Sequence, residues 1–202
     1  TYSFSPATNT GTIPVPGGAK PNLYNCTFGG ACGATIPAGN HNVYRYQPLL
    51  TYTANAANRQ YGDPNPALSG AVSGLVNGDT AADAYSGTLA FTSPAVGTTP
   101  VGGAAINGSG LTSDIGYGFV QAPGNATALT ITARPITLTA GSAARGYGDP
   151  NPVPAPLYAV GGNGMANAED AQTLFGFTVA SGAIGTTPVG AYAVGANAYN
   201  IA

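Results

Sequence analysis

The chain has 202 residues, of which only 6% are charged, and its formal net charge at pH 7 is −2. Glycine supplies 31 residues and proline 17, yet 44% of the residues are hydrophobic and they include twelve Tyr and six Phe, which are too many aromatic residues for a disordered chain. The chain has few charges and its five basic residues are scattered, so it cannot neutralise the phosphate backbone of a nucleic acid. We therefore expect no nucleic-acid partner.

Residues 1–47 form an N-terminal extension that is rich in Pro and Thr and is not a copy of a later segment. Tyr2 and Phe4 alternate with polar residues, and Ile13 and Val15 flank a proline, which predicts short β-like pieces without an obvious partner nearby. The chain has neither a run of about 18 apolar residues nor a basic, apolar leader, so we expect no membrane span and no signal peptide in it.

Two cysteines, Cys26 and Cys32, bracket a short loop that contains two glycines. A metal site would need more thiols or histidines nearby, and a redox pair is usually Cys-x-x-Cys. The spacing therefore predicts a local disulfide formed in an oxidising compartment outside the cytoplasm.

Beyond the extension, short alternating segments separated by Gly, Pro, Asn and Asp clusters predict an all-β protein. We expect strands at 49–54, 68–74, 85–93, 100–106, 114–120, 128–133 and 135–140. Helix is expected only as a turn or two, within 79–85 and 164–175, where Ala, Met, Glu and Gln gather. This pattern predicts antiparallel sandwiches or small barrels.

Two sequence strings recur in the same order. YGDPNP occupies Tyr61–Pro66 and Tyr147–Pro152, 86 positions later, and GTTPVG begins at Gly97 and again 88 positions later at Gly185. The chain is therefore a tandem repeat, with a first domain at 48–134 and a second at 135–202 after the 1–47 extension. We expect two immunoglobulin-like or β-grasp-like sandwich domains of about 85 residues each.

The YGDPNP string predicts a turn, because its prolines cannot donate to a strand ladder and its Asp, Asn and Gly favour turn conformations. An arginine lies two positions before each copy. We expect it to pin the turn, by pairing with the aspartate or by stacking on an aromatic ring, rather than to bind a ligand. The residues of this repeated motif are Arg59, Tyr61, Gly62, Asp63 and Pro64 in the first copy, and Arg145, Tyr147, Gly148, Asp149 and Pro150 in the second.

Candidate chemistry is sparse. His41 lies in the polar, turn-like string GNHNV and is expected at the surface, and the adjacent Glu169 and Asp170 would point to different faces of a helix. Asp and Asn of each YGDPNP copy offer oxygens to calcium, but one carboxylate per turn favours capping instead. We expect no enzyme activity, cofactor or metal. Three N-x-S/T sequons, at Asn25, Asn107 and Asn125, leave glycosylation open.

The strings LTITARPITLTA, YGDPNP, GLVNGDT and GTTPVG, followed by an aromatic strand, resemble the MBG and YDG-type repeats of large bacterial surface adhesins of the filamentous haemagglutinin kind. The resemblance covers about residues 49–202, and the second copy departs from it where GGNGMANAED replaces GLVNGDT. It implies a secreted or cell-surface protein with a role in adhesion or in building a biofilm matrix.

The second copy also differs at its end. We align Tyr199 with Tyr117, after which only three residues remain, so the second domain is expected to lack its last strand. Either the chain is a fragment of a longer repeat array, or the strand arrives from a neighbouring subunit by donor-strand exchange. In the second case Tyr2, Phe4, Ile13 and Val15 form the donor strand, and Tyr199 and Ile201 lie on the acceptor edge.

These observations predict an extracellular structural protein, a subunit of a bacterial surface filament or matrix fibre that assembles head to tail with itself. Its other expected partners are host or substratum surfaces or glycans. The alternative is a spacer or stalk segment of a large secreted adhesin.

Overall fold

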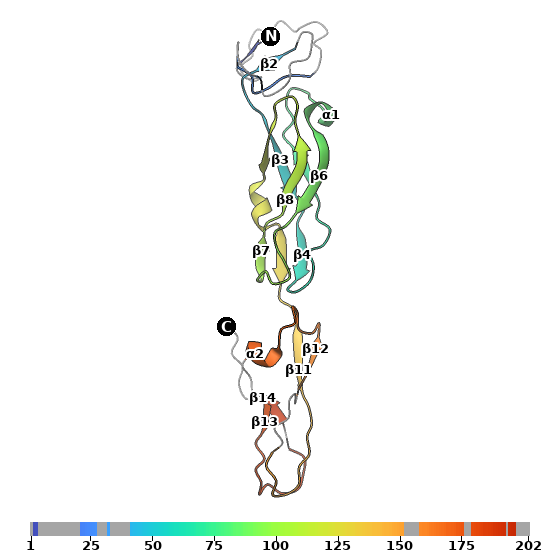
Figure 1. Cartoon of the computed structure of the whole chain (residues 1–202), viewed down its shortest axis with the longest axis vertical. Helices are drawn as coiled ribbons and strands as arrows, with labels where there is room; N and C mark the ends of the chain where they lie inside the picture. Colours follow the sequence, from blue (N-terminus) through green and yellow to red (C-terminus); the bar gives the residue numbers. More distant parts are fainter. Residues whose placement is uncertain are drawn as a thin grey trace. The chain divides into compact units, whose positions relative to one another are not determined.

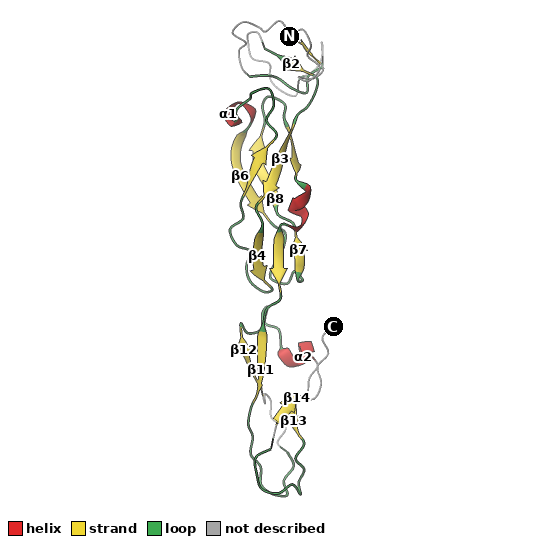
Figure 2. Cartoon of the chain, turned by 180° about the vertical axis from the view of Figure 1, so that it is seen from behind, coloured by secondary structure: helices red, strands yellow, loops and turns green. Residues whose placement is uncertain are grey.

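Strands predominate over helices in the computed structural model, which describes residues 2–3, 21–27, 32, 41–151, 158–175, 179–192 and 194–196 (Figures 1 and 2). The chain divides into two units. The first comprises Thr1–Arg59, Asn65–Ala95 and Val101–Ile131. The second comprises Thr132–Ala202 together with two segments of the first repeat, Gln60–Pro64 and Val96–Pro100.

The first repeat and the extension contain ten of the described strands, which pair in four small sheets. Their order is β1–β2, β5–β3–β9, β4–β10–β7 and β6–β8. The elements are β1 (Tyr2–Ser3), β2 (Val43–Tyr44), β3 (Leu49–Ala54), β4 (Ala57–Gln60), β5 (Gly70–Ser73), α1 (Ala81–Ala84), β6 (Ser86–Thr92), β7 (Gly102–Ala104), β8 (Asn107–Thr112), β9 (Gly118–Gln121), the 3₁₀ helix η2 (Pro123–Thr127) and β10 (Leu129–Thr132).

The sheets are not purely antiparallel, contrary to the sequence-based prediction. Strand β3 pairs with β5 in antiparallel fashion but with β9 in parallel. A parallel pair needs a crossover between its strands, and the long run from β3 to β9 provides it. The predicted strand at 114–120 begins only at Gly118, because the positive φ (96°) of Gly116 turns the chain before it.

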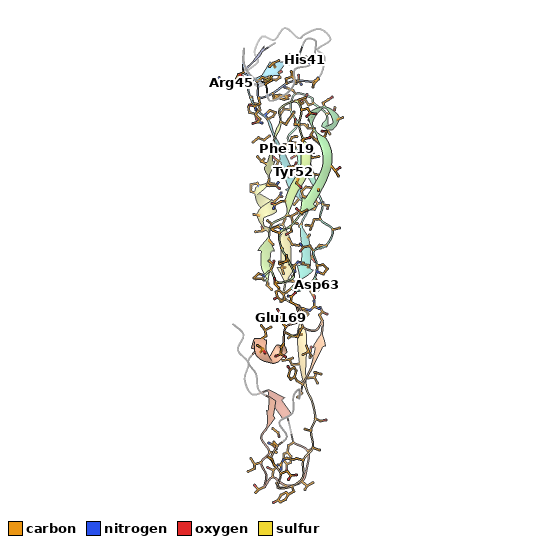
Figure 3. The ribbon with its side chains drawn as sticks, in the orientation of Figure 1. His41, Arg45, Tyr52, Asp63, Phe119 and Glu169 are labelled. Carbon is orange, nitrogen blue, oxygen red and sulfur yellow. A yellow bond between two sulfur atoms is a disulfide. The ribbon has the colours of Figure 1, made fainter. Side chains whose placement is uncertain are left out.

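Strand β8, whose sequence is NGSGLT, was not predicted, since it has few β-branched or aromatic residues. Its glycines are explained by its neighbours in the fold. A Cβ on Gly108 would lie 2.6 Å from the Tyr52 ring. That ring stacks on Phe119 (both labelled in Figure 3) and meets Phe91 edge-on. Tertiary packing therefore selects a small residue where propensity predicts no strand.

The extension contributes to the core of the first unit. Leu23 and Tyr24 are fully buried, and the Tyr24 ring stacks on Tyr44 at 5.4 Å and meets Tyr117 edge-on at 5.0 Å between ring centroids. The remaining members of this core cluster are Cys26, Leu50, Ala84 and Ile115. Burial of such side chains contributes roughly 1.5–3 kcal/mol each, so this part of the extension is integral to the first unit.

The prediction of a surface histidine at position 41 is wrong. His41 is buried, with 7% of its surface exposed, and its Nδ1 lies 3.2 Å from the carbonyl oxygen of Pro21. The polar string around it suggested a solvent-exposed turn, whereas the fold buries it beside the Pro21 carbonyl oxygen.

The second unit contains β11 (Ile136–Ala140), β12 (Tyr158–Gly162), α2 (Ala171–Phe175), β13 (Val179–Ser181) and β14 (Val194–Ala196). Strands β11 and β12 pair in antiparallel fashion, as β3 and β5 do, and β13 and β14 pair as β6 and β8 do. The second repeat therefore reproduces two strand pairs of the first.

The β6–β8 and β13–β14 registers are related by one offset. Phe91 pairs with Gly108 and Val179 with Ala196, so each partner is displaced by 88 positions (91 to 179 and 108 to 196). The prediction that aligns Tyr199 with Tyr117 concerns residues beyond this register. Tyr199 and Ile201 themselves lie outside the described residues.

Candidate functional site

The two recurring strings, YGDPNP and GTTPVG, contact each other in both repeats. The Gly62 N–H donates to the Gly97 carbonyl at 3.1 Å, and the Gly148 N–H donates to the Gly185 carbonyl at the same distance. We call these structures the first paired turn (60–66 with 95–100) and the second paired turn (146–151 with 183–188). The sequence revealed both strings, but nothing in their spacing indicated that they are partners.

An asparagine closes each paired turn. Asn65 Nδ2 donates to the Ala95 carbonyl at 2.7 Å, and Asn151 Nδ2 donates to the Ala183 carbonyl at 2.6 Å. A carbonyl bonded in this way fixes the path of the second string against the first, which explains why Asn follows the first proline in both copies.

The arginines before each turn hold it through different acceptors. The buried Arg59 donates from Nε to Asn65 Oδ1 at 2.8 Å, whereas Arg145 donates from Nη1 to the Asp149 carbonyl at 2.8 Å and from Nη2 to the Ile184 carbonyl. Both arginines therefore pin the turn.

A third arginine, which the sequence did not single out as a site residue, pairs with the first turn. Arg134 Nη1 lies 2.7 Å from Asp63 Oδ1, and the same guanidinium donates to the carbonyls of Gly164 at 2.9 Å and Asn163 at 2.5 Å. These contacts lie within the second unit. Asp63 thus has a cationic partner within the chain.

The tyrosine of the first turn binds a carboxylate. Tyr61 Oη donates to Glu169 Oε1 at 2.6 Å, and Asn163 Nδ2 donates to Gln60 Oε1 nearby (Asp63 and Glu169 are labelled in Figure 3). The hydrogen bond to Glu169 raises the pKa of Tyr61. Glu169 lies in a short loop, 166–170, that we call the second acidic loop.

Asp79 occupies the same place in the first acidic loop, 76–80, and binds a tyrosine of the extension. Tyr24 Oη donates to Asp79 Oδ2 at 2.6 Å, Tyr117 Oη at 2.9 Å to the same oxygen, and Asn22 Nδ2 to Oδ1 at 2.7 Å. Asp79 is 6% exposed. Burial, and next the bond to Asp79, raise the pKa of Tyr24, and burial raises the pKa of Tyr117 to about 12.

The backbones of the two acidic loops are alike. Asn77 and Asn167 have φ values of 55° and 51°, and the residues after them, Gly78 and Ala168, have 66° and 58°. In each loop the acidic residue's N–H closes a turn, Asp79 to Val76 and Glu169 to Ala166. Residues 166–169 of the string GGNGMANAED, which departs from GLVNGDT in sequence, therefore fold in the same way as residues 76–79.

The signal that could have revealed this equivalence is the pattern Asn-x-acid just before a helix. It reads Asn77-Gly-Asp in the first repeat and Asn167-Ala-Glu in the second. Asn tolerates a left-handed conformation better than most residues, so its position marks the turn even where the glycine is lost.

Comparison with known families bears on this first repeat. Residues 50–127 match the family model of the MBG domain (YGX type). MBG domains are found in extracellular adhesin-like proteins. No curated protein and no solved structure matches the chain.

The extension that precedes the matched residues contains the predicted disulfide. Cys26 and Cys32 are bonded, at a sequence separation of 6. Tyr2 lies in β1, which pairs in parallel with β2 of the same chain (Tyr2 with Val43). Phe4, Ile13 and Val15, the other residues of the predicted donor strand, lie outside the described residues.

The sequons differ in their surroundings. In the first repeat Asn125 is 2% exposed, accepts the Ala54 N–H at 2.8 Å and donates to the Tyr52 carbonyl at 2.9 Å, so a glycan there is incompatible with this network. Asn25 and Asn107 are exposed.

Over the described ranges, His, Cys, Asp and Glu side chains do not gather in groups of three or more that could hold a metal ion. In the same part of the chain, no helix is both long and apolar enough to cross a membrane.

Proposed function

We propose that the chain is a non-catalytic, structural repeat segment of an extracellular adhesin-like surface protein, and that its repeats act as spacers. The observation that carries this proposal is the paired turn, built twice with the same hydrogen bonds, in a chain whose first repeat matches the MBG domain. Repetition of one structural unit lengthens a protein and allows its copies to assemble, whereas an enzyme needs one unique cleft for its substrate.

The low charge of the chain supports a surface or matrix setting. With 6% charged residues there is little repulsion between copies, so such a protein is suited to a tethered or assembled state. The disulfide between Cys26 and Cys32 fits an oxidising compartment outside the cytoplasm.

The experiment that tests this proposal is surface labelling of intact producing cells. A membrane-impermeant amine reagent and an external protease are expected to modify and cleave the protein while a cytoplasmic marker stays untouched. Protection of the chain until the cells are lysed would contradict an extracellular role.

A second candidate function is a filament subunit that assembles head to tail by donor-strand exchange, with the donor residues at 2–15 and the acceptor edge near Tyr199. The low charge favours it, but β1 already pairs with β2 within the same chain, so we rank the spacer first. Sedimentation of native material separates the two. Large polymers that disappear when residues 1–15 are deleted favour the filament, whereas a single small species favours the spacer.

A further inference from the structure

The tyrosines that bind the two acidic loops come from different kinds of segment. In the first loop the tyrosine is Tyr24 of the extension, and in the second it is Tyr61 of a YGDPNP turn. In both cases a phenolic hydroxyl donates at 2.6 Å to the carboxylate that follows a left-handed Asn by two positions. The same chemistry is thus used twice, and the extension takes the place that a YGDPNP turn takes in the other loop.

The second YGDPNP turn carries the same groups without this contact. Tyr147 is 68% exposed, whereas Tyr61 is half-buried. Ile184 of the same paired turn is 65% exposed, and Val189, which directly follows that turn, is 94% exposed. Exposed apolar residues that gather around a polar anchor are typical of an interaction surface.

Glycines at equivalent positions mark close contacts that the first paired turn makes and the second paired turn, within the described residues, does not. A Cβ on Gly62 would lie 2.2 Å from the Ala166 Cβ of the acidic loop, and one on Gly97 would lie 2.9 Å from Asn167 Oδ1. At Gly148 a Cβ would meet nothing within 4 Å, and at Gly185 it would approach only the second turn itself. The second turn therefore retains the close-approach glycines, and the described chain places nothing against them.

We infer that the second paired turn is a docking surface for the acidic loop of a further MBG-type repeat. The partner supplies an Asn-x-Asp/Glu loop whose carboxylate accepts the Tyr147 hydroxyl, a small residue against Gly148, and a guanidinium for Asp149, as Glu169, Ala166 and Arg134 do for the first turn. A second copy of this chain does not fit, because Tyr24 and Tyr61 already occupy its own two loops.

This inference rests on the proposed function only in taking a structural repeat as the partner. It is tested by placing a photo-crosslinking amino acid at Ala144, an exposed position three residues before Tyr147, in the protein produced by its own cells. The crosslinked peptide is expected to contain an Asn-x-Asp/Glu loop of another repeat. Tyr147→Ser is expected to lower the adduct yield about tenfold, because it removes a hydrogen bond to a charged acceptor and an aromatic anchor.

Two matched controls accompany this variant. Leu174→Ser removes another large exposed side chain of the second unit, 53% exposed and outside the second paired turn, and is expected to leave the yield unchanged. The crosslinker placed at Thr139, an exposed residue of β11, is expected to give no such adduct. All of these positions are at the surface, so the variants are expected to fold.

The inference is overturned if no adduct forms, if the adduct lies on a peptide without such a loop, or if Tyr147→Ser does not change the yield. It is also overturned if the purified chain self-associates in sedimentation equilibrium in a manner that Tyr147→Ser abolishes, since the partner would then be a second copy. If the protein is labelled on intact cells but no crosslinked adduct forms, the docking surface is refuted and the spacer function is unaffected. If the protein is protected from labelling in intact cells, the spacer function itself is refuted.

Discussion

At the scale of single residues, the same acidic position has two different environments. Asp79 is buried and accepts three side-chain hydrogen bonds, whereas Glu169 accepts its bond from the half-buried Tyr61. A buried carboxylate has to be fully hydrogen-bonded because desolvation of the charge is costly, and water can replace a lost partner only where the site is exposed.

We therefore expect Asp79→Ala to destabilise the first unit by about 3 kcal/mol, because it leaves the Tyr24 and Asn22 donors buried without this acceptor and Tyr117 with only the Val76 carbonyl at 3.4 Å. The loss is measured as the free energy of opening of the β3 amides in native-state hydrogen exchange. Glu169→Ala is the matched control and is expected to cost clearly less in the second unit; equal losses would show that burial does not distinguish the two sites.

Ala168 gives a second prediction at this scale. It has a φ of 58°, a conformation that costs a residue with a Cβ roughly 1 kcal/mol, and Gly78 stands at the equivalent place in the first loop. Ala168→Gly is expected to raise the stability of the second unit by about 0.5 kcal/mol after the extra chain entropy of glycine is included. Thermal unfolding followed by circular dichroism measures it, and a lower melting temperature would contradict it.

At the scale of elements, the paired turn joins two strings that lie more than thirty positions apart in the sequence of each repeat. The asparagine that closes the turn makes different hydrogen bonds in the two copies. Asn65 accepts from the buried Arg59 as well as donating to Ala95, while Arg145 bonds backbone carbonyls instead of Asn151.

Asn65→Ala is accordingly expected to cost about 2 kcal/mol in the first unit, because it removes one hydrogen bond and leaves the buried Arg59 without its Nε acceptor. Asn151→Ala is expected to cost about 1 kcal/mol, because it removes one short hydrogen bond to Ala183 and a long, weak one to Ser181 at 3.4 Å. Urea unfolding of the two variants compares these losses. The reverse order would show that Arg59 does not depend on Asn65.

The buried tyrosines set the alkaline limit of the first unit. The pKa of Tyr117 is raised from 10.0 to about 12, and that of Tyr24 is raised as well, so the folded state retains protons that the unfolded chain has lost. The protonated tyrosines contribute their full stabilisation below pH 10. The free energy of unfolding of the first unit is expected to fall as the pH rises from about 10 through 12. Ultraviolet titration of tyrosinate beside circular dichroism tests this; full ionisation of both groups at pH 10 without loss of structure would refute it.

At the scale of the whole chain, the extension belongs to the first unit and its disulfide restrains it. Cys26 and Cys32 close a loop at a separation of 6 residues, and Cys26 is buried in the same core as Tyr24. On loop-closure entropy alone, reduction is expected to destabilise this segment by about 2 kcal/mol. Mass-resolved hydrogen exchange of residues 21–27 with and without reductant measures the effect, and unchanged protection would contradict it.

The sequence by itself determined the β-rich character, the repeat, the YGDPNP turn and the disulfide. Alternation, turn residues and recurring strings are local signals, and β3 was predicted with its observed bounds for that reason. The sequence also indicated the arginines that pin each turn, although not the atoms that they bond.

Tertiary structure alone decided the parallel pairing of β3 with β9, the glycine-rich strand β8, the burial of His41 and the partnership of the two recurring strings. It also matched Asp79 with Glu169 across loops of different sequence, and Tyr24 with Tyr61 across segments of different origin. Each of these depends on side chains that are distant in the chain and meet only on folding, so no local pattern of residues encodes them.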